Sequence, residues 1–272
     1  MTLGFGAAAL LPRARGGGVL RMGLSRLSEE GWLDPTPDLS VRAGHFDEHP
    51  DSVEVRPEGE DAAREVAELL GVAGGLEDAA RSVWEDLCVL TRDAGGTYRL
   101  TGGAVAFPTD WRLGDKMGLT LPEVHAPIQG YAEQLAAGVD RFIENLRPGE
   151  IWGRANWFVV ASDNLRYLPA DDPAERFVHV TPANAGDALF LRCERQTLRR
   201  LPATGAVLFT IGVYRCPLRD LDDAALNRIC DAFASLIEGE GDRRGVPHYT
   251  EALRGHAAAR SGPARANREA IS

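Results

Sequence analysis

The sequence lacks the short motifs that identify several common enzyme classes. Its 272 residues contain no GxGxxG, GxSxG or HExxH pattern and no Walker P-loop. These absences remove the motif evidence for a nucleotide-binding dehydrogenase, an α/β-hydrolase, an HExxH metallopeptidase or a P-loop NTPase. If the chain is an oxidoreductase, its electrons must therefore arrive from another polypeptide.

Cysteines are few, and long apolar runs are absent. The four cysteines, Cys88, Cys193, Cys216 and Cys230, form no CxxC pair and no CxxCH motif. This spacing excludes a zinc ribbon, a cysteine-ligated iron–sulfur cluster and covalent c-type haem. The apolar residues 3–11 have no charged segment before them, which argues against a secretory signal. No run reaches the roughly 20 apolar residues that a membrane span requires.

Acidic residues outnumber basic ones. The chain has 40 Asp and Glu against 30 Lys and Arg, which gives a net charge of −10, and its isoelectric point is about 5.2. Nucleic acids and anionic membranes favour basic surfaces, so neither is expected as the main partner. We expect a cytoplasmic protein whose acidic surface can dock the basic patch of a redox partner.

Hydrophobic periodicity predicts an α+β fold. Strand patterns occupy residues 84–91, 98–107, 151–160, 189–198 and 206–214. Helical spacing is found over residues 61–70, 131–146 and 222–237.

We expect one folded domain in this chain. Residues 1–20 contain three consecutive glycines and are predicted to be a disordered extension. Residues 21–255 form the single domain, with helical additions at both ends, and the polar residues 256–272 are predicted to be a disordered tail.

Residues 187–218 combine two strand-like runs with a dense set of charges. Alternation places Arg192, Glu194 and Gln196 on one face of the first run. An acid flanked by arginines in apolar surroundings needs a partner or a function, although a solvated edge strand with surface salt bridges gives the same pattern. On the second run, small residues around Gly212 leave one face low enough for a flat ligand or a closely packed helix.

The segment LRCERQTLRRLPATGAVLFTI, with VHAPIQGY, RANW and WEDLCVL before it, resembles the haem-dependent oxidative N-demethylase family from about Trp32 to about Leu253. The resemblance implies a PAS-like antiparallel sheet with helices packed around it. It also implies a bound haem that uses O2 and external electrons to oxidise a small amine. The predicted order of two strands, a helical stretch and three strands agrees with such a sheet.

Of the six histidines, we assign His125 in LPEVHAPIQGY as the axial haem ligand and therefore as the metal-binding residue. Imidazole is the usual proximal donor, and a proline-flanked turn fixes its orientation. From the residues alone, a structural or exposed histidine is the simpler interpretation, and the resemblance favours ligation. His179 in FVHV is the alternative ligand or a distal-pocket group. Without a CxxCH motif the haem is expected to be haem b, and a thiolate ligand from Cys193 or Cys216 is not expected.

Haem propionates need cationic or polar partners. Arg154, Arg195 and Arg199 are the predicted cofactor-binding cations, and Asn156 is placed at the cofactor as well. For the pair Arg199 and Arg200, a surface basic patch is the alternative interpretation.

Glu194 is the predicted substrate-binding and catalytic residue, because a cationic amine needs a carboxylate in a partly dry pocket. The alternative is an intramolecular pair with Arg192 or Arg195. Tyr131 is predicted to line the same pocket as a catalytic residue, although an aromatic residue at this spacing also fits the core.

Our leading hypothesis is a haem-dependent monooxygenase that oxidises a small amine or amino acid by N-demethylation-type chemistry. O2 is the co-substrate, and a separate reductase or ferredoxin supplies the electrons. The alternatives are a haem-based sensor without turnover and a haem-free PAS-like binding module. The substrate and the oligomeric state stay open at this point.

Overall fold

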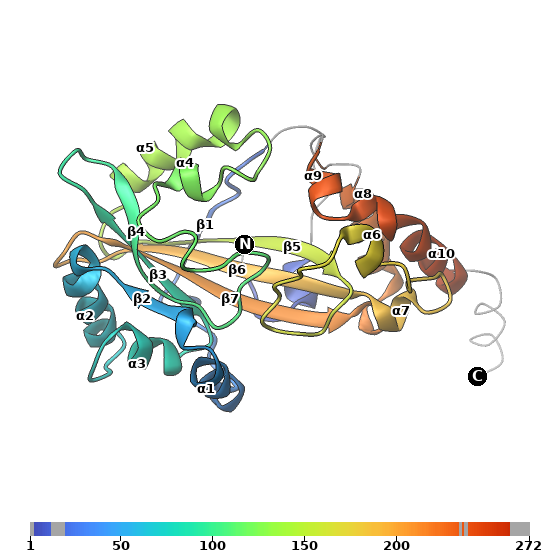
Figure 1. The fold of residues 1–272 in the computed structure, drawn as a ribbon, viewed down its shortest axis with the longest axis horizontal. Coiled ribbons are helices and arrows are strands. Elements are labelled where there is room, and N and C mark those ends of the chain that lie inside the picture. The colour runs from blue at the N-terminus through green and yellow to red at the C-terminus, as the bar shows by residue number, and fades with distance from the viewer. Residues whose placement is uncertain (1–2, 12–19, 234–235, 237–238, 262–272) are drawn as a thin grey trace.

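The computed structural model describes residues 3–11, 20–233, 236 and 239–261 (Figure 1). The strands are Ser25–Leu27 (β1), Val53–Val55 (β2), Asp86–Arg92 (β3), Tyr98–Ala104 (β4), Ile151–Val160 (β5), Phe190–Arg200 (β6) and Val207–Pro217 (β7). The α-helices are Leu39–Glu48 (α1), Glu60–Leu69 (α2), Leu76–Arg81 (α3), Leu121–Val124 (α4), Ala137–Asn145 (α5), Pro173–Arg176 (α6), Ala185–Ala188 (α7), Asp223–Phe233 (α8), Glu240–Arg243 (α9) and Thr250–Ser261 (α10). A π-helical turn, Ala132–Ala136 (η4), precedes α5.

The strands form one antiparallel sheet in the order β1-β5-β6-β7-β3-β4-β2. Without the two short edge strands, the order is β5-β6-β7-β3-β4, so the first and last strands of the five lie together at the centre. This arrangement confirms the predicted α+β fold with a PAS-like sheet. The predicted strand over residues 151–160 matches β5 in both bounds.

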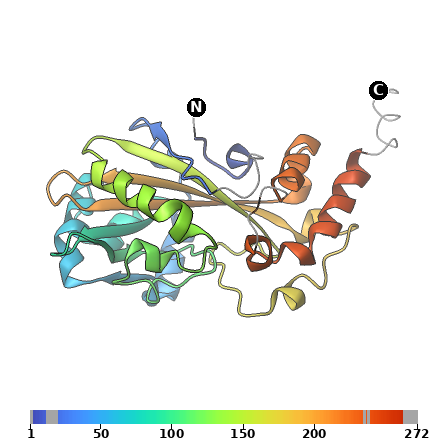
Figure 2. The ribbon, with the colours of Figure 1, turned by 90° about the horizontal axis from the view of Figure 1, so that it is seen from above.

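Helices cover the two faces of the sheet differently. Figure 1 shows α4 and α5 on one side and α1, α2 and α3 on the other, and Figure 2 shows α8 and α10 at the far end of the long strands. Register pairs Arg154 with Gln196 and Asn156 with Glu194, so these four side chains share one face. We call this the α5 face, because Phe142 of α5 contacts Trp152, which points to the same side of β5 as Arg154. The opposite face is the α2 face.

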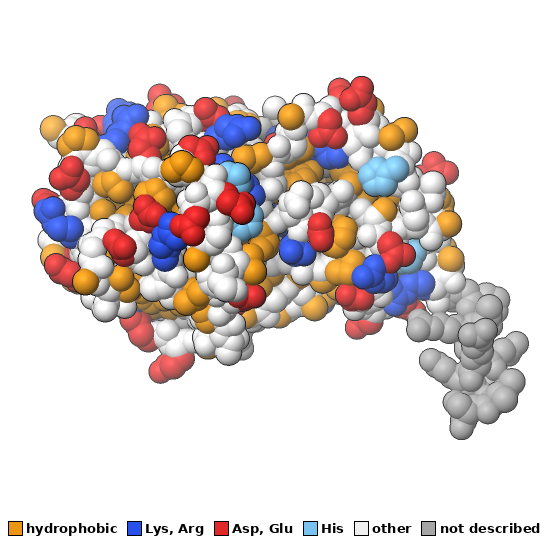
Figure 3. Space-filling view, turned by 60° about the horizontal axis from the view of Figure 1, so that its bottom comes forward, with side chains coloured by type: hydrophobic (Ala, Val, Ile, Leu, Met, Phe, Trp, Pro, Cys, Tyr) orange, Lys and Arg blue, Asp and Glu red, His pale blue; other side chains and the backbone are white. Residues whose placement is uncertain are grey.

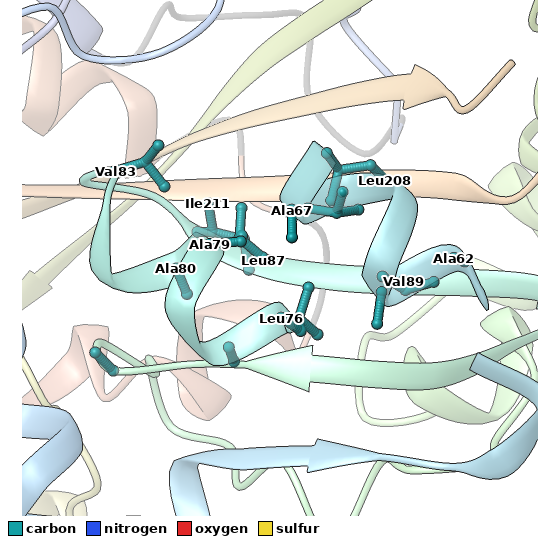
Figure 4. Packing of buried hydrophobic residues seen from close by; sticks show 14 of the residues in the cluster. Ala62, Ala67, Leu76, Ala79, Ala80, Val83, Leu87, Val89, Leu208 and Ile211 are labelled. Atoms are coloured by element: carbon teal, nitrogen blue, oxygen red, sulfur yellow. The ribbon is translucent and has the colours of Figure 1, made fainter. Parts of the chain in front are cut away.

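The α2 face carries the largest apolar layer around the sheet centre. Val66 of α2 belongs to one buried cluster with Leu76 of α3, Leu87, Val89 and Leu208. Figure 4 shows the last four of these side chains. Burying each such side chain contributes about 1.5 to 3 kcal/mol of transfer free energy. These contacts fix the helices on this face.

The low patch predicted around Gly212 is filled in the structure. A Cβ atom at Gly212 would lie 3.2 Å from the Tyr214 ring and 3.5 Å from Glu85. Beside it, the buried hydroxyls of Thr197 and Thr210 bond to each other at 2.6 Å. The α2 face therefore leaves no room for a flat ligand at this point.

Residues 3–11 differ from the expectation of a disordered extension. Ala7 and Leu10 are buried against the sheet, and the Cys193 thiol donates to the carbonyls of both residues at 3.7 Å. The apolar run gives this segment enough surface to pack, which overcomes the cost of ordering it. Residues 12–19 lie outside the described residues. At the other end, α10 extends to Ser261, past the predicted start of the tail at residue 256.

None of the helices in the described ranges is long and apolar enough to cross a membrane. Acidic and basic side chains alternate over the face shown in Figure 3, with apolar patches between them. The net charge of −10 is therefore spread rather than gathered on this face.

Arg192 of β6 fastens two irregular segments to the α5 face. Its guanidinium donates to the carbonyls of Phe107, Pro108 and Leu165 and to the Thr109 hydroxyl, at 2.8 to 3.1 Å, and the side chain is 1% exposed. A fifth bond of 3.1 Å goes to the carbonyl of residue 164. Removing the guanidinium would take a charged donor away from each of these acceptors.

We expect Arg192→Met to reduce the free energy of unfolding by roughly 3 to 5 kcal/mol, because several buried carbonyls lose their donor. Arg215→Met is the matched control: Arg215 lies opposite Arg192 on β7, is exposed, and forms a 3.9 Å ion pair with the exposed Asp163. Its loss should change stability by about 0.5 kcal/mol or less. Urea unfolding of both variants measures the difference, and equal effects would contradict the structural role of Arg192.

Candidate functional site

His125 follows a short, well-capped helix. Thr120 and Glu123 form a capping box at the start of α4, and Pro122 occupies its first turn. The Nδ1 atom of His125 lies 2.8 Å from the carbonyl oxygen of Leu121. Because only a protonated Nδ1 can bond a carbonyl, this contact selects the tautomer whose Nε2 is an acceptor. Among the described residues, no hydrogen bond to Nε2 is formed.

Tyr131 holds the imidazole from one side. Its ring stacks on that of His125 with centroids 4.4 Å apart and an angle of 8° between the planes. Tyr131 is 5% exposed, and its hydroxyl has no hydrogen-bond partner among the described residues. Burial, with a contribution from the charge of Asp140, raises the pKa of this phenol to about 12. The hydroxyl is thus a buried, protonated donor.

The turn that positions Tyr131 is unusual. The next five residues, Ala132–Ala136, are π-helical, and the α-helix resumes at Ala137. Isolated π-turns within helices are frequent at functional sites, because the extra residue changes the direction of nearby side chains. The sequence pattern predicts one helix over residues 131–146 and does not reveal this turn.

His125 is kept neutral by its surroundings. Burial lowers its pKa below the usual 6.5, and the positive charges of Arg154 and Lys116 lower it further, against the effect of the hydrogen bond to Leu121. A neutral imidazole with an acceptor Nε2 is the form that binds a metal ion. The structure thus brings His125, Tyr131 and Arg154 into one neighbourhood on the α5 face.

Glu194 lies on the same face in a small polar patch. Its side chain is 6% exposed, and its Oε2 atom accepts hydrogen bonds from the amides of Gln196 at 2.9 Å and Asn156 at 3.4 Å. These partners are neutral amides, whereas Arg192 directs its bonds to carbonyls. Arg154 is the next residue on this face, two positions before Asn156 on β5.

Arg243 of α9 approaches this patch from the C-terminal part of the chain. Its guanidinium binds Glu240 through bonds of 2.6 and 2.8 Å, which raise its pKa, and the charges of Asp110 and Glu194 act in the same direction. Residues from β5, β6 and α9 thus meet at one end of the α5 face. Nothing in the local sequence around Arg243 indicates this position.

Two of the predicted cofactor-binding arginines lie elsewhere. Arg195 and Arg199 pair with Ala155 and Ile151 of β5 and point to the α2 face. Arg195 donates to the carbonyl of Trp32 at 2.7 Å, and Arg199 binds Glu29 at 2.5 Å. The structure does not bring them together with His125, because strand alternation sends odd and even residues of β6 to opposite sides.

His179, the alternative ligand, is exposed in the turn after α6. Its backbone carbonyl accepts a hydrogen bond of 2.8 Å from Asn184. The exposed ring lacks the fixed, partly buried setting that His125 has. In the parts of the chain that the structure describes, no group of three or more His, Cys, Asp or Glu side chains is arranged to hold a metal ion.

A groove of about 480 Å³ opens at the start of β5. It is lined by Met22, Gly23, Leu24, Phe142, Asn145, Leu146, Glu150 and Trp152. His125 is not among these residues, but Trp152 and Arg154 are successive members of the α5 face. The groove therefore lies beside the polar patch and not within it.

Sequence reasoning missed two partners of the site. Gln196 was placed on the face of Glu194 but given no role, although alternation alone makes it the nearest donor on the same strand. The Leu121 carbonyl was also missed. Its signal is the spacing of four residues to His125, which is the spacing of a contact across one helical turn.

One comparison with known proteins identifies a family. Residues 73–254, more than half of the chain, match the family described as haem-dependent oxidative N-demethylase, alpha subunit-like. The match covers His125, Tyr131, Arg154 and Glu194 and begins later than the resemblance estimated from the motifs.

In cofactor-free protein, we expect His125 to show the Nδ1–H tautomer at pH 7 and to ionise below the usual 6.5, because burial and nearby cations disfavour the imidazolium. Long-range 1H–15N NMR of histidine-labelled protein measures both properties, with His125→Gln and His179→Gln to assign the signals. An Nε2–H tautomer, or ionisation at or above pH 6.5, would contradict this geometry.

Proposed function

The chain belongs to the haem-dependent oxidative N-demethylase, alpha subunit-like family, and from this premise we propose that it binds haem b through His125 and oxidises the N-methyl group of a small amine. The proposal extends the family name in three respects: the ligand, the mono-oxygenation and the substrate class. The ligand and the substrate class are supported by side chains on the α5 face, and mono-oxygenation is inferred from the family name.

The donor set around His125 fits a haem iron. The Nδ1 bond to Leu121 fixes the ring plane, and the stacked Tyr131 ring restricts its tilt. Such outer contacts orient a ligating imidazole and increase its basicity. The orphaned, buried hydroxyl of Tyr131 marks a point where a polar group of a ligand can be accommodated. This arrangement of His125 is the observation that carries the proposal.

Arg154 is the residue that we assign to a haem propionate. It lies on the α5 face, and its charge acts on both His125 and Tyr131. A charged hydrogen bond to a carboxylate contributes about 1.5 to 3 kcal/mol. We leave Arg195 and Arg199 out of the cofactor site, because they face the other side of the sheet.

Glu194 is assigned to bind the ammonium group of the substrate. The amides of Asn156 and Gln196 hold one carboxylate oxygen, so the group is oriented before the amine arrives. A buried ammonium ion needs such a pre-placed partner, because desolvating an unpaired charge costs several kcal/mol. Tyr131 supplies a buried hydroxyl donor and excludes water beside His125.

Haem, when bound, supplies the activation of O2. In the overall reaction, an N-methylamine, O2, two electrons and two protons give the demethylated amine, formaldehyde and water. The electrons are assigned to a separate ferredoxin or reductase, since the chain carries no nicotinamide-binding fingerprint or cysteine cluster.

We expect His125→Ala to reduce haem content by about tenfold or more, because the axial bond and its oriented donor are lost together. His179→Ala is the matched control and should keep the haem and its absorption spectrum. Ultraviolet-visible and pyridine haemochrome spectra of the purified proteins measure both. A wild-type protein that takes up no haem would refute the proposed function, and haem retained in His125→Ala would move the ligand to another residue.

For Glu194→Gln, we expect the KM for a cationic amine to rise about 10- to 100-fold, since a charged hydrogen bond of about 1.5 to 3 kcal/mol is removed. The assay is amine-dependent O2 consumption with an artificial reductant, using a panel of secondary and tertiary methylamines and N-methyl amino acids. Glu144→Gln on the exposed face of α5 is the control. Unaltered kinetics would return Glu194 to a structural role, and haem without any turnover would favour a sensor.

A further inference from the structure

A second buried acid lies on the α2 face, away from the proposed site. Glu85 precedes β3 and is 0% exposed. Its Oε1 atom accepts a hydrogen bond of 2.9 Å from the backbone N–H of Asp34. Its Oε2 atom is buried and has no hydrogen-bond partner among the described residues. A carboxylate in this setting is costly when ionised.

The segment that Glu85 holds is residues 28–34, which we call the N-terminal strap. Arg195 donates to the carbonyls of Gly31 and Trp32, and the Arg199 guanidinium lies 4.4 Å from the centre of the Trp32 ring. Trp32 is 5% exposed. The strap is thus fastened to the α2 face by arginines at one end and by Glu85 at the other.

Several charged or titratable groups face Glu85. Asp34 of the strap accepts a hydrogen bond of 2.7 Å from the Tyr214 hydroxyl of β7. Arg195 comes from β6, and Arg42 of α1 donates to the backbone carbonyl of Glu85. Both guanidinium groups are already bonded to backbone carbonyls or to Asp86. Neither is placed to give the unpartnered Oε2 atom a donor.

We propose that Glu85 is a proton-operated latch, which keeps the N-terminal strap on the sheet while it is protonated and weakens that contact when it ionises. Ionisation places a negative charge beside the Asp34 carboxylate and on an oxygen without a donor. The strap can relieve both by moving away and admitting water. Protonation removes the charge and keeps the bond from the Asp34 N–H.

The sign of the pH effect follows from the two states of the carboxyl. Burial raises the pKa of Glu85 to about 7 in the closed strap, against an ordinary value of 4.5 when water reaches it. The closed strap therefore binds the proton more tightly. Proton binding by Glu85 therefore stabilises the closed strap fully below about pH 4.5. This stabilisation is lost as the pH rises to about 7, and above that pH the group no longer contributes to closure.

The strap is continuous with a segment that borders the proposed haem site. β1 pairs with residues 151–153 of β5, immediately before Arg154. Further towards the N-terminus, the backbone N–H of Leu20 donates to Gln134 of the π-turn at 2.8 Å. A looser strap gives this edge more freedom. This regulatory consequence rests on the proposed function, whereas the latch itself does not.

Amide hydrogen exchange of the full chain, followed by mass spectrometry from pH 5 to 8, tests the latch. Rates in residues 28–34 are divided by the intrinsic rate at each pH. In the wild type we expect protection to fall by up to about tenfold per pH unit between pH 5 and 7 and then to level off. Glu85→Gln should give protection that does not change with pH. Glu68→Gln, on the exposed side of α2, should behave as the wild type.

Asp34→Asn is the second variant, which keeps an acceptor for Tyr214 but removes the neighbouring charge. Protection should then level off at a lower pH, since that charge disfavours ionisation of Glu85. The latch would be overturned if protection in the wild type did not change with pH. It would also be overturned if Glu85→Gln kept the pH profile of the wild type. If Glu85→Gln does not fold, the comparison of the pH profiles of the wild type and Asp34→Asn still tests the latch.

The consequence for the site has its own readout. Haem transfer to excess apomyoglobin should be faster at pH 7.5 than at pH 5.5 in the wild type, and this pH difference should be smaller in Glu85→Gln. A protein without haem would refute the proposed function and leave the exchange result standing. Haem transfer with the same pH dependence in both proteins would refute only the coupling of the strap to the site.

Discussion

Buried guanidinium groups on β6 are the constraint on which the irregular parts of this fold depend. Arg192 and Arg195 are three residues apart, so strand alternation sends them to opposite faces. Each is almost fully buried and must find carbonyl acceptors. Arg192 finds them at residues 107, 108, 164 and 165, and Arg195 at Gly31 and Trp32. Two loops and the strap are therefore positioned by one strand.

This arrangement separates two acids that look alike in the sequence. Glu194 and Glu85 are both buried, yet Glu194 receives two amide donors, whereas one oxygen of Glu85 has no donor within the described part of the chain. An oriented carboxylate suits recognition of a cation, whereas a poorly solvated one suits proton binding. The tasks that we propose for these two residues therefore differ because of their environment and not because of their residue type.

The sheet and its long hairpin could be predicted because period-two alternation is a local signal, and the shared face of Arg192, Glu194 and Gln196 follows from it. The hydrogen-bond partners of the buried arginines could not be predicted from the sequence. Their acceptors lie 27 to 192 residues away in the chain, and no local pattern shows which carbonyls will be left unpaired. The packing of residues 3–11 and the π-turn after Tyr131 were missed for the same reason: tertiary contacts decide both.

The chain path joins the two faces physically. Residues 20–27 border the helix that carries Tyr131 and the strand that carries Arg154, and the next residues cross to the α2 face to meet Arg195 and Glu85. A change in how the strap is held therefore reaches the α5 face along covalent backbone and an edge strand of only three residues. So short an edge resists little force, because it contributes few ladder hydrogen bonds. Under the latch proposal, proton binding at Glu85 and ligand binding at the proposed site act on the same segment, and any coupling between them is reciprocal.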